Sequence, residues 1–360
     1  MHMITCRYCG GSTLARVLDL GLVPAADHFP EMAGDAEGDA VYPLAMLLCA
    51  DCALAQLEAD DTATEEPKAV EPQSLRDQAA DAVARVAAAG WLAGESAYEF
   101  GSPHGGSWMD LIGARGLRPV RDGPADVVLD SFGMMHNADQ AAAIRLRAER
   151  TKPGGMLLLQ VHSVETILVQ RQWNSLRHGH FAYYSLSVLR RMLGDCGMAI
   201  VAVWEFDLYG GTLLVAARHG THHLPDAART VLERERAAGV LTTQGFDPLQ
   251  DSVDIQVRRL TDWLGAKVSA GERVYAYGAP SRAVALFALA GLSTGMLAAV
   301  ADASSAKQGR RMPGTDIPII APAQLVSARP DYVLLTLPDL HDEVRAAFPE
   351  LEGRWVSGLC

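Results

Sequence analysis

Two Cys-x-x-Cys pairs near the N-terminus place the tightest constraint on how this chain folds. Cys6 and Cys9 form the first pair, and Cys49 and Cys52 form the second, about forty residues later. Four thiolates at this spacing are typical of a tetrahedral structural zinc site, in which all four coordination positions of the metal are filled and none is left for catalysis. Disulfides or free thiols are the alternative, and an intracellular compartment disfavours disulfides. We expect residues 1–58 to form a small zinc-binding module.

The remainder of the chain is long enough for two further domains. The 360 residues are 49% hydrophobic and 21% charged, with a formal net charge of −12. This charge argues against a general nucleic-acid binder, because phosphate binding needs clustered Lys and Arg. No apolar run has the length of a membrane span, and the first residues lack the pattern of a signal peptide. We therefore expect a cytoplasmic protein that binds a small molecule, with no nucleic-acid or membrane partner.

The middle of the chain alternates between strand and helix patterns. Residues 59–73 are acidic, contain Thr, Ala and Pro, and lack apolar periodicity, so they are interpreted as a linker. Residues 74–220 are interpreted as one α/β domain, whose alternation predicts a mostly parallel sheet. Its predicted strands are 96–100, 126–130, 156–161, 200–206 and 212–217, and its predicted helices include 74–90 and 187–194.

A glycine-rich turn follows the first predicted strand of this domain. Gly101, His104 and Gly105 lie in the segment 101–106, just before a predicted helix. Such a turn lets a ligand approach the backbone and meet the helix N-terminus. These three residues are therefore candidates for cofactor binding, although a lone glycine-rich turn is a weak signal.

The last part of the chain repeats the alternation. Residues 221–268 contain helical patterns, including 251–268, and are interpreted as helices that bridge two domains. Residues 269–360 show strand and helix patterns in turn, which predicts a second Rossmann-like domain that binds substrate. The expected fold is thus α/β, with an N-terminal zinc-binding module followed by two Rossmann-like α/β domains.

Several side chains that can exchange protons near neutral pH lie in the middle domain. His178 and His180 are followed closely by Tyr183 and Tyr184, which makes residues 175–184 a candidate active-site segment. A packed His pair with aromatic neighbours is the alternative. His136 and His162 follow predicted strands at the edge where α/β sheets hold their ligands, so both are candidates for lining the site, against a role in surface loops.

Motifs along most of the chain resemble one family, the three-domain sugar C-methyltransferases that modify nucleotide-linked deoxy-ketosugars. The N-terminal motifs are Cys6-x-x-Cys9-Gly10, Leu20-Gly21, Pro24, Tyr42-Pro43-Leu44, Cys49-x-x-Cys52 and Gln56-Leu57. The later motifs are His178-x-His180-Phe181-x-Tyr183-Tyr184-Ser185-Leu186, Tyr209-Gly210-Gly211-Thr212-Leu213, Tyr277-Gly278-Ala279-Pro280, Asp302 and residues 307–315. The resemblance implies a zinc module, a middle domain that binds S-adenosylmethionine, and a C-terminal domain that helps to hold a sugar nucleotide.

The chain departs from this family at positions that serve the cofactor and the proton transfer. The family's Gly-Ser-Asn-Asp-Gly turn is replaced here by residues 101–105, with Pro103 in it. Only 25 residues separate Gly101 from Asp126, about half of what the family uses, and the missing part includes the acidic residue for the cofactor ribose. The family's His before Gly-Gly is Tyr209, and its His-Glu-His is His178-Gly179-His180.

These departures favour an enzyme of bacterial specialised metabolism that acts next to a carbonyl without S-adenosylmethionine. His178 or His180 would move the proton, and Tyr183, Tyr184 or Tyr209 would hydrogen-bond the developing oxyanion. The outcome would be isomerisation, epimerisation, elimination or ring closure. One alternative is an S-adenosylmethionine-dependent C-methyltransferase that acts on a nucleotide-linked ketosugar or a related ketone, and the other is a non-catalytic scaffold.

Basic residues of the last domain are candidates for binding a substrate phosphate. Lys307 and Arg310 lie in a turn after a predicted strand, with Arg311 beside them, and charge-assisted phosphate contacts suit such a turn. Arg282, at the start of a predicted helix, is expected to add to this anion site. A solvated basic turn is the alternative.

Overall fold

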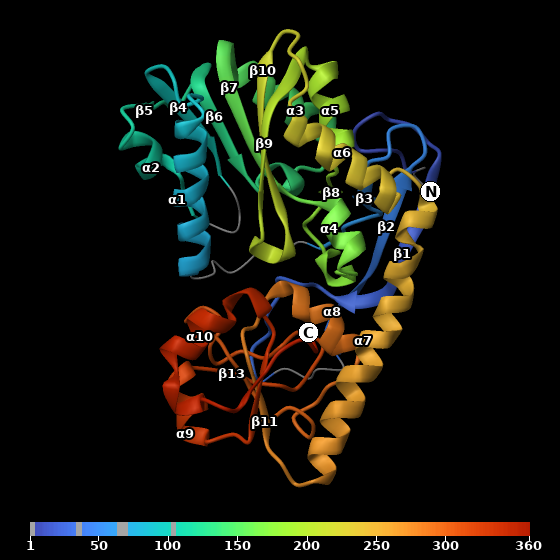
Figure 1. Ribbon diagram of the computed structural model, residues 1–360. Coiled ribbons are helices and arrows are strands. Elements are labelled where there is room, and N and C mark those ends of the chain that lie inside the picture. The colour runs from blue at the N-terminus through green and yellow to red at the C-terminus, as the bar shows by residue number, and fades with distance from the viewer. Residues whose placement is uncertain (1–3, 34–37, 63–70, 102–105) are drawn as a thin grey trace.

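Three β-sheets organise this computed structural model, which describes residues 4–33, 38–62, 71–101 and 106–360. The sheet of the zinc-binding module lies beside the large sheet of the middle domain, and the sheet of the C-terminal domain lies below both in the view of Figure 1. The predicted α/β fold, with a zinc module and two Rossmann-like domains, is confirmed.

The zinc-module sheet contains a strand from the distant candidate active-site segment. Its described strands follow the order β1-β2-β3-β8, and each neighbouring pair is antiparallel. Sheets of few short strands have little stability on their own. The fourth strand, β8, comes from a distant part of the chain and adds backbone hydrogen bonds to β3. The bounds are β1 (Leu14–Pro24), β2 (Val41–Cys49), β3 (Ala55–Leu57) and β8 (Ala182–Tyr183).

The middle domain is built on a sheet with described strand order β5-β4-β6-β7-β10-β9. Its first four strands are parallel, and β10 runs antiparallel to both β7 and β9. Strand β6 carries a continuous apolar run, Val127–Leu129, because helices cover both of its faces. The bounds are β4 (Ser96–Phe100), β5 (Arg118–Pro119), β6 (Ala125–Ser131), β7 (Thr151–His162), β9 (Met198–Phe206) and β10 (Thr212–His219).

Helices flank this sheet on both faces in Figure 1. Helix α1 stands on one side, and α3 and α5 pack on the other, where α5 contacts β9. Between β4 and β6 the described chain forms only the five-residue α2 and the two-residue β5, so this edge of the domain is short. The bounds are α1 (Gln73–Ala88), α2 (Met109–Gly113), α3 (Gln140–Arg150), α4 (Val164–Val169) and α5 (Leu186–Asp195).

The C-terminal domain has a parallel sheet with described order β13-β12-β11-β14-β15. Its central strands β11 and β14 are largely buried, as expected for a parallel sheet covered by helices. The strand bounds are β11 (Val274–Tyr277), β12 (Val300–Ala301), β13 (Ile319–Ile320), β14 (Tyr332–Leu335) and β15 (Trp355–Val356). The helix bounds are α8 (Ser281–Leu289), α9 (Pro322–Ala328) and α10 (His341–Ala347).

Two helices connect the middle and C-terminal domains. Helix α6 (Asp226–Ala238) packs on α5 and β9, and α7 (Thr243–Ser269) runs along one side of the molecule from the middle domain to the C-terminal domain (Figure 1). Helix α7 begins eight residues before the predicted 251–268, because Pro248 is accommodated inside the helix. Proline usually breaks a helix interior, which explains why the pattern predicted a later start.

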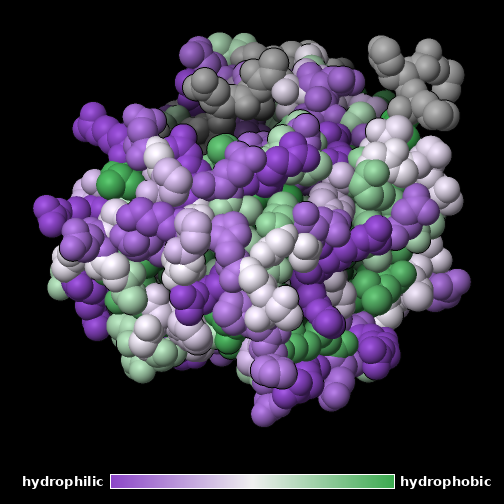
Figure 2. Space-filling view, turned by 90° about the horizontal axis from the view of Figure 1, so that it is seen from above, coloured by the Kyte–Doolittle hydropathy of each residue, from purple (hydrophilic) through white to green (hydrophobic). Residues whose placement is uncertain are grey.

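Hydrophilic and hydrophobic residues are unevenly represented on the surface. The face seen from above in Figure 2 is mostly hydrophilic, and its hydrophobic residues lie in small separate groups. In the described part of the chain, no helix combines the length and the apolar character needed to cross a membrane.

Candidate active site

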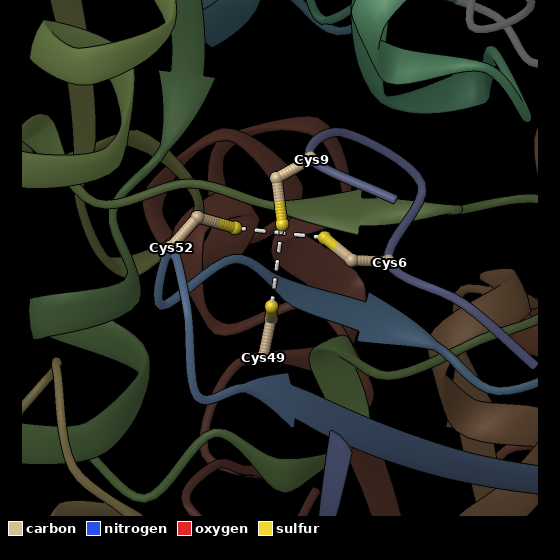
Figure 3. A group of neighbouring side chains, drawn as sticks. All are labelled: Cys6, Cys9, Cys49 and Cys52. Carbon is tan, nitrogen blue, oxygen red and sulfur yellow. Dashed lines mark hydrogen bonds between the residues drawn. The ribbon is translucent and has the colours of Figure 1, made fainter. Parts of the chain in front are cut away.

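The four paired cysteines converge on one point, as Figure 3 shows. Their sulfur atoms all lie within 4.8 Å of one another, with 3.5 Å between Cys6 and Cys52 and 3.6 Å between Cys9 and Cys49. Tetrahedral zinc with Zn–S bonds of about 2.3 Å requires sulfur atoms about 3.8 Å apart. The cysteines therefore fit a structural zinc ion, and within the described ranges no other group of metal-ligating side chains was found.

A cavity of about 290 Å³ lies between the middle domain and the C-terminal domain. The carboxyl ends of parallel strands β4, β6 and β7 open into it, which is where α/β sheets hold their ligands. From the end of the linker and the middle domain it is lined by Glu71, Pro72, Leu75, Glu99, Phe100, Gly106, Trp108, Ser131, Phe132, Met135, His162, Ile167, Asn174, Ser175, Arg177, His180, Tyr183 and Tyr209. From the C-terminal domain it is lined by Tyr277, Gly278, Pro280, Ser281, Arg282, Asp302, Ala303, Lys307, Leu337, Asp339, Leu340, Glu343 and Val344.

The two tyrosines of the candidate segment point in opposite directions. Tyr183 lines the cavity, and its phenol oxygen accepts a hydrogen bond from the amide of Arg177 at 3.1 Å. Burial raises the pKa of Tyr183 well above its usual value, so this phenol stays protonated and can donate. Tyr184 directly follows β8, and successive residues of an extended segment face opposite sides. Tyr184 therefore lies in the core, where its hydroxyl donates to Gln140 at 2.5 Å, outside the lining of the cavity.

The two histidines of the segment are also separated. His180 lines the cavity, with its Nε2 at 2.8 Å from Nε of Arg177. The described lining does not include His178, whose Nε2 lies 3.2 Å from the carbonyl oxygen of Pro43 in the zinc module. Burial lowers the pKa of His178, which favours the neutral ring. The residue between them, Gly179, has a φ of 81° and donates its amide hydrogen to Asp60 at 2.5 Å. His178 is thus placed to hold the segment against the zinc module, which differs from the expected proton transfer.

Three aromatic rings that line the cavity, those of Phe132, His162 and Tyr209, pack against one another. His162, at the end of β7, lies with its ring centroid 4.8 Å from that of Phe132 and 5.5 Å from that of Tyr209. Tyr209 adopts a φ of 55°, which is unusual for a bulky residue. His136 is outside the described lining, and its ring packs edge-on against His180 at 4.8 Å.

The basic residues of the C-terminal domain divide between two roles. Lys307 and Arg282 line the cavity. Arg282 lies 3.8 Å from Asp339, and burial lowers the pKa of Arg282 and raises that of Asp339. Lys307 donates to the carbonyl of Ala279 at 2.8 Å.

Arg310 and Arg311 instead bind the zinc module. Arg310 donates to the carbonyl of Phe29 at 2.8 Å, and Arg311 forms a buried two-contact ion pair with Asp39, at 2.5 and 2.7 Å. Neither residue belongs to the described lining. Their guanidinium groups are committed to joining two units of the protein, which differs from the expected contact with a substrate phosphate.

The glycine-rich turn is only partly described. Gly101 is exposed and outside the described lining, whereas His104 and Gly105 lie outside the described residues. Glu99 and Arg177 were not predicted, although both line the cavity. The position of Glu99 at the carboxyl end of a predicted parallel strand was the available signal. Arg177 gave no such signal, because its role depends on its contact with His180.

Two family models match the chain. Residues 6–65 match the model described as "Putative zinc binding domain", and residues 207–359 match the model described as "C-methyltransferase C-terminal domain". The first covers all four cysteines, and the second covers Tyr209, Arg282 and Lys307.

The chain is also similar to the C-methyltransferase NovU from Streptomyces niveus. The two are 26% identical over 412 aligned residues, which cover 98% of this chain and 94% of the relative. Because the aligned length exceeds the 360 residues of this chain, the relative contains residues that have no counterpart here.

Solved methyltransferase structures show weaker similarity. Magnesium protoporphyrin IX methyltransferase from Synechocystis PCC 6803, with bound SAH, is 14% identical with a TM-score of 0.32, covering 42% of this chain and 90% of that one. The CcbJ methyltransferase from Streptomyces caelestis is 13% identical with a TM-score of 0.27, covering 40% of this chain and 90% of that one. Likenesses at these scores do not bear on the function.

Proposed function

Because the chain belongs to the C-methyltransferase family with its zinc module, we propose that it is an S-adenosylmethionine-dependent C-methyltransferase acting on a carbon next to a carbonyl. The main support is the cavity between the middle and C-terminal domains, into which one domain brings aromatic rings and carboxylates and the other brings two basic side chains. The preferred sequence interpretation, proton transfer without S-adenosylmethionine, is not confirmed, and the family relationship favours its alternative.

The wall from the middle domain suits a cation. Glu71 and Glu99 contribute carboxylates, and Phe100, Trp108 and Phe132 contribute aromatic rings. Carboxylates and aromatic faces both attract a positively charged group such as a sulfonium. When bound, S-adenosylmethionine supplies an electrophilic methyl group. The side chains around Glu99 would hold its charged end at the carboxyl end of β4.

The wall from the C-terminal domain contains two cations that can bind an anion, beside the carboxylates of Asp302, Asp339 and Glu343. Arg282 lies at the start of α8, and Lys307 lies in the turn after β12. Their charges support a nucleotide-linked ketosugar or a related anionic ketone as substrate. A carbon acid bound here would lie between the two walls, where proximity to a methyl donor contributes much of the rate.

A second candidate function is proton transfer next to a carbonyl without the methyl donor. The specific observation in its favour is the two-residue β5, which ends at Pro119. In the described segment between β5 and β6, no acidic side chain lines the cavity to bind a cofactor ribose. The two candidates share the same carbonyl chemistry and differ in the cofactor.

Calorimetry with S-adenosylmethionine separates them. We expect binding with a Kd in the micromolar range, and Glu99→Gln should weaken it about tenfold because it removes one charge from the cationic subsite. Glu95→Gln is the matched control, since Glu95 is an exposed carboxylate just before the same strand and outside the described lining. Methyl transfer from labelled donor to a thymidine-diphosphate-linked 4-keto-6-deoxyhexose tests the reaction itself. No binding and no transfer would overturn the proposed function and favour the second candidate.

A further inference from the structure

We propose that His162 is the base that removes the proton next to the substrate carbonyl and that Tyr209 donates a hydrogen bond to the oxygen of the resulting enolate. This inference rests on the carbonyl substrate of the proposed function, but it does not require S-adenosylmethionine. The sequence predicts that His162 lines the site and that His178 or His180 moves the proton. The geometry points to a different imidazole.

The backbone brings His162 and Tyr209 to the same wall. His162 is the last residue of β7, and it pairs with Thr212 across the antiparallel ladder to β10. Tyr209 lies in the turn that leads into β10, three residues before Thr212. Both side chains line the cavity, with ring centroids 5.5 Å apart. Phe132 contacts both rings, which gives the pair an apolar backing that strengthens polar contacts with a ligand.

Tyr209 is held in a costly conformation. Its φ of 55° and ψ of 31° lie in the left-handed region, which costs a bulky residue about 1–3 kcal/mol. Gly211 packs so closely on Thr166 that an added Cβ would lie 2.5 Å from the Thr166 hydroxyl oxygen. Gln170 donates to the carbonyl of Gly210 at 2.7 Å. The neighbouring segment 166–170 therefore fixes this turn and keeps the phenol at the cavity.

A positive charge lines the same cavity as this phenol. Arg282 extends from the opposite domain, 3.8 Å from Asp339. A guanidinium at this position favours negative charge that develops on an oxygen hydrogen-bonded to the phenol. The cavity thus brings together His162, which can accept a proton, Tyr209, which can donate a hydrogen bond to the oxygen, and Arg282, whose charge stabilises the enolate.

The other imidazoles are less suited to accept a proton. Both ring nitrogens of His180 lie within 3.5 Å of Nε of Arg177, so protonating this ring would place two positive charges side by side. His178 and His136 are outside the described lining of the cavity. Of the two imidazoles among the described lining residues, His162 and His180, the contact with Arg177 disfavours His180 as the base.

The proposed step conserves atoms and charge. The C–H bond next to the carbonyl breaks, its proton moves to a ring nitrogen of His162, and its electron pair forms a C=C bond. The carbonyl π electrons move to oxygen, which accepts a hydrogen bond from Tyr209. In deuterated water the imidazolium exchanges its proton with solvent and returns deuterium to the same carbon.

Deuterium exchange without S-adenosylmethionine tests this step. The wild-type protein is mixed with a thymidine-diphosphate-linked 4-keto-6-deoxyhexose in deuterated water, and uptake at the carbon next to the ketone is followed by mass spectrometry. We expect exchange that falls about 100-fold or more in His162→Gln and about 100-fold in Tyr209→Phe. His222→Gln, a change at an exposed histidine outside the described lining, should exchange like the wild type.

Chemical rescue distinguishes a base from a packing residue. Imidazole added to His162→Ala should restore part of the exchange, because the shortened side chain leaves room for a free imidazole to act as the base. If His162 only packs against its neighbours, added imidazole should not restore exchange. Full exchange in His162→Gln, loss confined to His180→Gln, or no exchange by the wild type would each overturn the proposal. Exchange without methyl transfer would instead overturn the proposed function and leave His162 as the base.

Discussion

Ala55 and Tyr183 face each other across the ladder between β3 and β8. Ala55 lies three residues after the zinc ligand Cys52, and Tyr183 lines the cavity. The amide of Leu57 also donates to the carbonyl of Phe181 at 3.2 Å. The zinc module therefore supplies the strand on which the candidate active-site segment is built, and loss of the metal should affect both stability and the cavity.

Replacement of a zinc ligand should show this link. Cys49→Ser removes one of four ligands, and we expect loss of bound zinc with destabilisation by at least about 3 kcal/mol, because metal binding in such modules contributes directly to folding. Metal content and the free energy of unfolding in urea measure the two effects. Cys196→Ser, at a cysteine outside the cluster, is the control and should retain zinc. A zinc-free Cys49→Ser variant with wild-type stability would contradict the link.

Removal of Arg311 should weaken the contact between the C-terminal domain and the zinc module. Arg311→Met leaves the largely buried carboxylate of Asp39 without its partner, which is expected to cost about 3 kcal/mol of unfolding free energy. Arg16→Met on β1 removes two ion pairs of an exposed guanidinium, with Asp19 and Glu58, and should cost less than about 1 kcal/mol. Equal costs for the two variants in urea unfolding would show that the pair with Asp39 does not join the units.

The buried ring of His178 should make stability depend on pH. Burial lowers its pKa in the folded protein below the usual 6.5. As the pH falls below about 6.5, the unfolded chain binds a proton that the folded chain does not, so the free energy of unfolding decreases. His178→Gln can keep a donor for the Pro43 carbonyl without titrating, and the dependence on pH between about 5 and 7 should become shallower. An unchanged slope would count against this assignment.

Lys307 and Arg310 should differ in their effect on ligand binding although they are three residues apart. Lys307→Met removes a charge from the cavity and should weaken binding of thymidine diphosphate about tenfold or more, the usual effect of a lost charge-assisted hydrogen bond. Arg310→Met removes a contact with Phe29 outside the described lining and should leave the Kd within about twofold. Calorimetry with thymidine diphosphate measures both. A larger effect from Arg310→Met would mean that the turn binds phosphate as the sequence predicted.

Local patterns predicted the secondary structure well, because each depends on neighbours in the chain. The strand 96–100 was predicted with the bounds that β4 has, and the predicted strand 126–130 lies within β6 (Ala125–Ser131). The helix pattern at 187–194 corresponds to α5 (Leu186–Asp195), whose apolar residues face the core. The start of α7 was missed because a proline within a helix is disfavoured locally and is tolerated here in a packed helix.

The candidate site was predicted less completely, because it depends on contacts between distant segments. The segment 175–184 was identified, but its side chains divide between the cavity, the core and the zinc module. Tyr183 ends β8 and Tyr184 directly follows it, so the two side chains of this extended segment face opposite sides, and the pairing of β8 with β3 decides which of them faces the cavity. Sequence spacing alone carries no information on that pairing.

The sequence by itself determined the zinc ligands, the α/β alternation and the family, since each is encoded by residue types at short spacing. Only the tertiary structure decided which of the candidate residues share one cavity. Arg311 and Lys307 carry similar charge in the same turn, yet the approach of Asp39 draws one into an interface and leaves the other at the cavity. His162 and Tyr209 likewise meet because β7 and β10 pair, 47 residues apart in the chain. Contacts between segments that are far apart in the chain thus decide the role of each side chain, and the sequence around each residue does not encode these contacts.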